Sequence, residues 1–138
     1  MVLVIWQKVW GEALALSYLL QETLLKESDI VTLHIALNAE TRDFITEKDL
    51  ALMKPSAILV NTARGPVVNE MALANALKQG KIAGAATDVY GTEPPLKPEN
   101  PLFGAPNLIM LPHIGFATEE AFILRLGIVV RNIEEHYC

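Results

Sequence analysis

Three side chains between residues 64 and 113 could perform acid–base chemistry on a carboxylic acid: Arg64, Glu93 and His113. A guanidinium can hold a carboxylate through two parallel hydrogen bonds. An imidazole titrates near neutrality, so His113 is the best candidate for a proton donor or acceptor. A carboxylate such as Glu93, if it lies close, would stabilise the imidazolium and raise its pKa. Together these groups could bind a 2-hydroxy acid and take its hydroxyl proton while a hydride leaves.

Each of these residues also has a simpler interpretation. An arginine in a polar turn is most often a surface residue, and a histidine after a proline is more often structural than catalytic. Glu93, which precedes two prolines, is on its own most often an exposed loop acid. Asp88 is more suggestive, because an acid buried at the end of a strand needs a partner. The functional interpretation therefore depends on whether the fold brings these residues together.

Apolar, β-branched runs bounded by turn residues predict strands separated by helical segments. The strands are expected at Val2–Trp6, Asp29–Ile35, Ala57–Val60, Ala83–Val89 and Leu108–Leu111. The helices are expected at Gln21–Glu27, Glu47–Met53, Glu70–Gln79 and Glu119–Tyr137, with N-caps at Thr46, Asn69 and Thr118 and a terminating glycine at Gly80. This alternation predicts an α/β fold with a parallel sheet. The candidate residues follow strands, and ligands of such sheets bind beyond the carboxyl ends of the strands.

Composition limits the class of protein. The 138 residues suffice for one domain with a sizeable core, and the apolar content of 51% argues against disorder. The net charge of −5 and the lack of a Lys/Arg cluster argue against a nucleic-acid partner. No apolar run reaches the length of a membrane span. The single cysteine, Cys138, allows no disulfide framework or CxxC metal pair within the chain, which predicts a reducing, cytoplasmic setting and no metal site.

Three stretches carry a resemblance to a known family: MKPSAILVNTARGPVVNE, GAATDVYGTEPP and LPHIG, in that order. Residues 27–118 resemble the D-isomer-specific 2-hydroxyacid dehydrogenases. The resemblance implies hydride transfer between NAD, or alternatively NADP, and a small 2-hydroxy or 2-oxo acid. It implies that Arg64 binds the substrate carboxylate, that His113 is the acid/base and that Glu93 is its partner. The positions that it places near the nicotinamide are Ile35, Thr62, Ala63, Arg64, Asp88, His113, Ile114, Gly115 and Phe116.

The sequence departs from the family in its first part. None of its eight glycines takes the GxGxxG spacing that cradles a pyrophosphate. We therefore expect an incomplete Rossmann-like parallel sheet that lacks the first βα unit. Residues 1–118 are expected to form a partial NAD(P)-binding domain, and residues 119–138 a C-terminal helix returning toward an absent substrate domain.

Two functional hypotheses remain at this point. The first is an NAD(P)-dependent oxidoreductase of the D-2-hydroxyacid dehydrogenase type, present as a truncated chain. The alternative is a non-catalytic remnant or binding module, like the transcriptional corepressors that resemble this family. Family members commonly dimerise, so a homodimer is a possible assembly.

Overall fold

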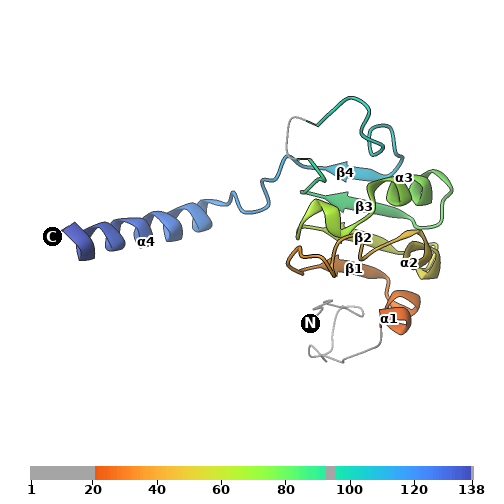
Figure 1. The fold of residues 1–138 in the computed structure, drawn as a ribbon, viewed down its shortest axis with the longest axis horizontal. Coiled ribbons are helices and arrows are strands. Elements are labelled where there is room, and N and C mark those ends of the chain that lie inside the picture. Colours follow the sequence, from red (N-terminus) through yellow and green to blue (C-terminus); the bar gives the residue numbers. More distant parts are fainter. Residues whose placement is uncertain (1–20, 93–95, 138) are drawn as a thin grey trace.

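The computed structural model describes residues 21–92 and 96–137, so the predicted strand Val2–Trp6 and the candidate residue Glu93 lie outside the described residues. Helices and strands alternate along the described chain as the sequence predicts, except that no helix lies between the last two strands in the described residues (Figure 1). They are α1 (Gln21–Glu27), β1 (Ile30–Leu33), α2 (Glu47–Leu52), β2 (Ile58–Asn61), the 3-10 turn η1 (Gly65–Val67), α3 (Glu70–Lys78), β3 (Gly84–Thr87), β4 (Leu108–Met110) and α4 (Glu119–Tyr137). The elements predicted within the described residues are confirmed, but three of the observed strands are shorter than expected.

The strands form one sheet in the order β1-β2-β3-β4, and every neighbouring pair is parallel. One row of paired residues crosses the sheet from Val31 through Leu59 and Ala85 to Leu108. This arrangement confirms the α/β prediction. Because all four strands run in the same direction, the loops that follow them emerge at one edge of the sheet, which is the edge where ligands of α/β proteins bind.

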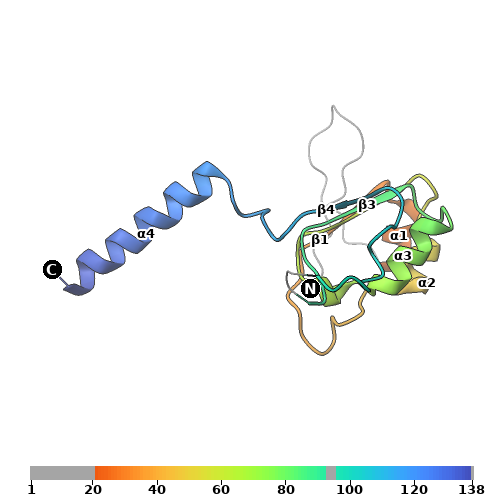
Figure 2. The same ribbon diagram turned by 90° about the horizontal axis from the view of Figure 1, so that it is seen from above.

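Burial alternates along the strands, as expected for a sheet with one covered face. Val31 and Leu33 of β1 and Leu59 of β2 are buried. The helices α1, α2 and α3 lie on the covered face (Figure 2), and the core there includes Leu25, Leu50, Leu73 and Leu77. On the opposite face Ile30, Ile58 and Ile109 are exposed in the described structure.

The helix-capping predictions hold. The Asn69 side chain accepts the N–H of the third residue of α3 at 2.9 Å. Gly80 has a φ of +64°, which closes the C-terminus of α3 in the left-handed conformation that glycine favours. The backbone N–H of Thr46 donates to the Asp49 carboxylate in the first turn of α2. The Thr118 hydroxyl accepts an N–H from the first turn of α4 at 3.2 Å.

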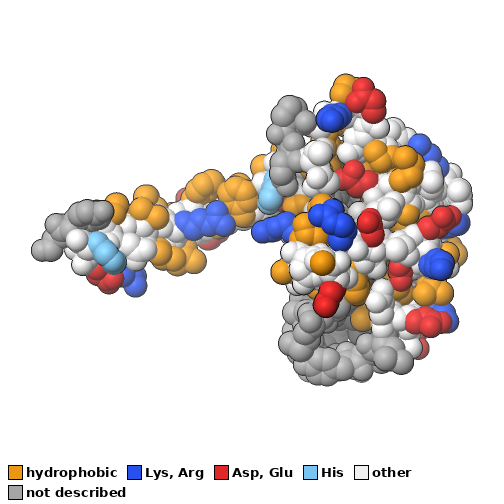
Figure 3. Space-filling view, in the orientation of Figure 1, with side chains coloured by type: hydrophobic (Ala, Val, Ile, Leu, Met, Phe, Trp, Pro, Cys, Tyr) orange, Lys and Arg blue, Asp and Glu red, His pale blue; other side chains and the backbone are white. Residues whose placement is uncertain are grey.

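Helix α4 extends away from the sheet (Figure 1), and hydrophobic side chains lie along it in the space-filling view (Figure 3). Its exposed apolar residues are Phe122, Ile123, Leu124, Leu126, Ile128, Val129, Val130 and Ile133. Near its start, the guanidinium of Arg125 lies 4.7 Å from the centroid of the Phe116 ring. Within the described part of the chain, no helix combines the length and apolarity needed to cross a membrane.

Candidate functional site

The turn that carries Arg64 is shaped by the last residue of β2. Asn61 is buried, and its amide oxygen accepts the N–H of Ala63 while its amide nitrogen donates to the carbonyl of Arg64, both at 3.1 Å. One guanidinium nitrogen of Arg64 donates to the carbonyl of Ala63 at 2.7 Å. Arg64 is an exposed residue, and a guanidinium carries further N–H groups beyond this bond. The backbone that presents the cation is therefore held by a buried amide.

Gly65 brings the Arg64 turn into direct contact with the segment that follows β3. A Cβ at position 65 would lie 1.9 Å from the carbonyl carbon of Tyr90 and 2.4 Å from its Cα. Only a residue without a side chain allows two backbones to approach this closely. Since Arg64 directly precedes Gly65, its position is fixed relative to the end of β3.

His113 lies three residues after the end of β4 and has a φ of +59°. This left-handed conformation is uncommon for a residue with a Cβ, although histidine adopts it more readily than bulky residues do. Such conformations persist where the surrounding structure enforces them, and they cluster at active sites. The His113 side chain is half-buried, and its ring meets Phe116 edge to face with centroids 6.2 Å apart.

The structure shows the partner that the buried carboxylate of Asp88 requires. One oxygen accepts the N–H of Ile114 at 2.8 Å, and the other accepts the N–H of Gly115 at 2.7 Å. A Cβ at position 115 would lie 2.8 Å from the second oxygen, so a glycine suits this site. Asp88 therefore holds the two residues that follow His113. That Asp88 also contacts a cofactor stays a prediction.

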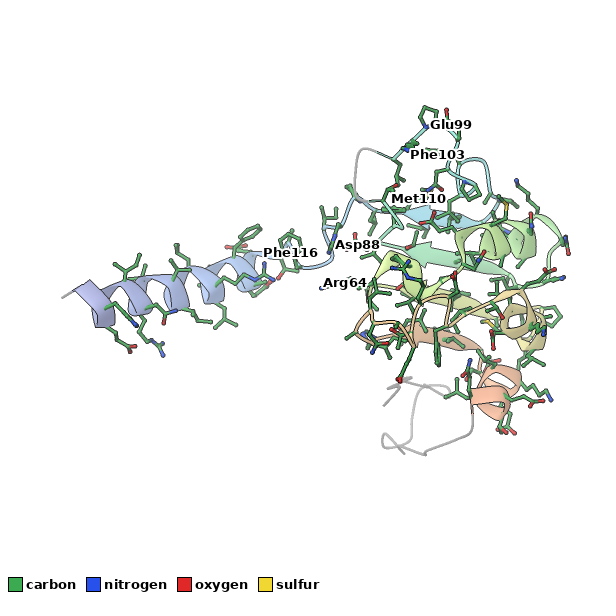
Figure 4. The ribbon with its side chains drawn as sticks, viewed as in Figure 1. Arg64, Asp88, Glu99, Phe103, Met110 and Phe116 are labelled. Carbon is green, nitrogen blue, oxygen red and sulfur yellow. The ribbon has the colours of Figure 1, made fainter. Side chains whose placement is uncertain are left out.

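The predicted residues of the Arg64 turn, Asp88 and the His113 loop lie at one edge of the sheet. Figure 4 shows Arg64, Asp88 and Phe116 on the side from which α4 extends. Thr62 is exposed beside Ala63, which is buried. Ile35 also follows a strand end, but its side chain belongs to the hydrophobic core. This edge of the sheet therefore carries the Arg64 cation, the His113 imidazole, and the loop after His113 that the Asp88 carboxylate binds.

Sequence analysis missed a second carboxylate that organises this edge. One oxygen of Glu70 accepts the N–H of Gly91 at 2.6 Å, and the other accepts the Asn100 amide at 3.0 Å. Glu70 opens α3, and its partners flank in sequence the segment that contains Glu93. The only signal in the sequence was an acid in the first turn of a helix, which the favourable helix dipole explains equally well.

A parallel α/β sheet with these groups beyond its strand ends has the form of a nucleotide-binding domain of an oxidoreductase. The family model described as "D-isomer specific 2-hydroxyacid dehydrogenase, NAD binding domain" matches residues 7–115. The chain belongs to this family. The resemblance inferred from its three sequence stretches is thereby confirmed.

Individual relatives agree with this assignment. A glyoxylate reductase of Thermococcus litoralis is 49% identical over 122 residues, which cover 88% of this chain and 36% of that protein. The structure of a D-lactate dehydrogenase from Sporolactobacillus sp. matches with a TM-score of 0.78 and 37% identity, over 85% of this chain and 39% of that one. An acyclic imino acid reductase in complex with NADPH and D-Arg matches with a TM-score of 0.78 and 35% identity, over 94% and 41%. The chain therefore spans little more than a third of its curated relative.

Proposed function

We propose that this chain provides the nicotinamide side of a site that transfers a hydride between NAD(P) and a small 2-hydroxy or 2-oxo acid. The observation that carries the proposal is the grouping of the Arg64 turn, Asp88 and the His113 loop through direct contacts at the carboxyl edge of the sheet. A cation and an imidazole at one edge are the groups needed to bind a carboxylate and to move a proton beside it.

The residues present fit one end of the cofactor. The Arg64 turn with Thr62, the Asp88 carboxylate and the exposed side chains of Ile114 and Phe116 would face the nicotinamide. When bound, the nicotinamide accepts or donates the hydride. The pyrophosphate cradle with GxGxxG spacing does not occur in this sequence, so the proposal covers the nicotinamide end only. NAD is the cofactor proposed first, with NADP as the alternative, because the family is described by NAD binding and one matching structure holds NADPH.

The side chains divide the remaining work. The exposed guanidinium of Arg64 binds the carboxylate of the acid and fixes its orientation. In the oxidation direction, neutral His113 takes the proton of the 2-hydroxyl group as the hydride leaves the same carbon. In the reduction direction, protonated His113 returns that proton to the oxygen of the 2-oxo group. The assignment of Glu93 as the partner of His113 stays a prediction, because Glu93 lies outside the described residues.

Substitution of His113 tests this proposal most directly. We expect His113→Asn to lower the kcat for NADH-dependent reduction of glyoxylate by about 100-fold or more, because proton transfer by a positioned side chain contributes a factor of this size. The measurement is the loss of NADH absorbance with glyoxylate as substrate. His136→Asn is the matched control, since His136 is an exposed residue of α4. Equal kcat values for wild type and His113→Asn would contradict the assignment of the acid/base.

The alternative of a non-catalytic binding module gains no support from the relatives described above, which are named as enzymes. The same assay separates the two hypotheses. NADH binding, seen as a change in cofactor fluorescence, without reduction of glyoxylate or hydroxypyruvate would favour the binding module.

The surface of α4 suggests how the chain assembles. Phe122, Leu126, Val129 and Ile133 are spaced by four, three and four residues, so they form one apolar stripe, and all four are exposed. An exposed stripe of this kind favours self-association. We propose that the homodimer expected from the family likeness forms through α4 in this chain. The return of residues 119–138 toward a substrate domain stays a prediction.

We expect the 138-residue chain to sediment as a dimer or larger species at micromolar concentration, and Leu126→Asp to shift it toward the monomer. A charge in the middle of the stripe would have to be buried in the helix pair, which is costly. Asn132→Asp, which adds the same charge to α4 outside the stripe, is the control. Identical sedimentation of Leu126→Asp and wild type would exclude this stripe as the contact.

A further inference from the structure

We propose that Tyr90 is a positioning residue of this site, whose hydroxyl and backbone together set the placement of His113 relative to Arg64. The inference rests on the proposed function for its chemical meaning, and on the contacts of one buried residue for its geometry. Tyr90 follows β3 by three residues and is 4% exposed. Because Tyr90 is buried, its proposed effect passes through the two loops that it contacts.

The hydroxyl of Tyr90 reaches the His113 loop. It donates to the carbonyl of Leu111 at 2.7 Å, and it lies 3.4 Å from the carbonyl of Thr87. The N–H of Leu111 in turn donates to the carbonyl of Thr87 at 3.0 Å. Both backbone polar groups of Leu111, two residues before His113, are therefore bonded: the N–H to the last residue of β3 and the carbonyl to the side chain of Tyr90 beyond it.

A second anchor lies on the other side of His113. Asp88 binds the N–H groups of Ile114 and Gly115, which directly follow the histidine. The left-handed backbone of His113 thus lies between the hydrogen bonds of Leu111 before it and the bonds from Asp88 to Ile114 and Gly115 after it. Both attachments come from the same short segment beyond β3. Loss of the Tyr90 hydroxyl would leave Leu111 attached through its N–H alone, so the restraint before His113 would be weaker.

The backbone of Tyr90 supports the other functional loop. Its carbonyl carbon, oxygen and Cα face Gly65 so closely that a Cβ on that residue would overlap all three atoms. Gly65 directly follows Arg64. Tyr90 therefore contacts both functional loops. Its backbone packs against the turn that carries Arg64, and its side chain bonds the loop that carries His113.

Packing alone does not require a tyrosine here. A phenylalanine ring would fill the same space, and the Leu111 carbonyl belongs to an exposed residue that water can reach. A buried hydroxyl needs a hydrogen-bond partner, and this one has its shorter hydrogen bond with the loop of the candidate acid/base. The added oxygen is thus placed where it restrains the loop, which is what a positioning role requires.

The test is Tyr90→Phe in the full 138-residue chain, followed by NMR and by kinetics. We expect amide hydrogen exchange at Ile114 and Gly115 to rise about fivefold, which corresponds to the loss of one ordinary hydrogen bond. The imidazole Cε1–H resonance of His113 should shift. The kcat for glyoxylate reduction should fall about tenfold while the KM for NADH stays unchanged, because misplacement of an acid/base affects the chemical step.

Ile82→Val is the control, because Ile82 is a buried core residue that precedes β3, whereas Tyr90 follows it, and the loss of one methylene there lowers stability. The inference is overturned if Tyr90→Phe leaves both NMR readouts at their wild-type values, or if Ile82→Val changes them to the same extent. It is also overturned if kcat is unchanged while the loop exchanges faster. Failure of wild type to reduce any 2-oxo acid would refute the proposed function, while the NMR readouts would still decide whether Tyr90 places the loop.

Discussion

Arg64→Ala is expected to lower kcat/KM for glyoxylate by about 1,000-fold and to weaken NADH binding by a much smaller factor. The expected size follows from the loss of a charge-assisted, two-point contact, for which truncation of one partner costs about 4 kcal/mol. The larger loss should fall on the acid, because Arg64 is the group proposed to bind the carboxylate directly, whereas other residues at this edge are also proposed to face the nicotinamide. Steady-state kinetics with glyoxylate varied at saturating NADH measures the effect.

Two further variants make the Arg64 prediction specific. Arg64→Lys keeps the charge but not the planar fork, so its kcat/KM should lie between those of wild type and Arg64→Ala. Arg131→Ala removes the same charge from an exposed position of α4 and should leave kcat/KM unchanged. If Arg64→Ala behaved like Arg131→Ala, Arg64 would have no role in binding the acid.

The sequence predicted the elements well because each is encoded locally. The apolar runs around Val31 and Leu59 identify strands wherever they sit in the chain, and caps such as Asn69 need only their nearest neighbours. The ends of the strands were predicted less well. β3 was expected to continue to Val89, but the hydroxyl of Thr87 donates to the carbonyl of Val89 at 2.7 Å and the chain turns there. Such a turn depends on side-chain geometry that an apolar pattern does not contain.

The candidate site was predictable only in part, for a related reason. Strand-end positions and the family resemblance indicated Arg64 and His113. The need of Asp88 for a partner was also predictable, but its partners lie 26 and 27 residues further along the chain and are backbone groups. Backbone groups have no signature in a sequence. The same holds for Tyr90, whose hydroxyl bonds a carbonyl 21 residues away.

Helix α4 illustrates the same limit on a larger scale. Its cap at Thr118 and its full extent were predicted, because both are local properties. Its apolar stripe indicates that one face of the helix packs against another surface. Periodicity shows which face is buried, but it does not identify the surface that buries it. The sedimentation experiment on Leu126→Asp addresses that partner directly for this chain.

Gly65→Ala is expected to lower the free energy of unfolding by about 3 kcal/mol and to reduce glyoxylate turnover in the folded fraction. The added Cβ would lie 1.9, 2.1 and 2.4 Å from three backbone atoms of Tyr90, and backbone cannot rotate away as a flexible side chain can. The turn carrying Arg64 must then separate from the segment that also holds the His113 loop, so stability and site geometry are lost together. Urea unfolding followed by circular dichroism gives the stability, and the glyoxylate assay gives the activity.

Gly104→Ala is the control, since Gly104 has a φ of +76° and no atom within 4 Å of its Cβ position. That variant should lose only about 1 kcal/mol, the cost of the left-handed backbone, and keep its turnover. Equal losses of stability in the two variants would mean that the contact between Gly65 and Tyr90 is not what holds the two loops together.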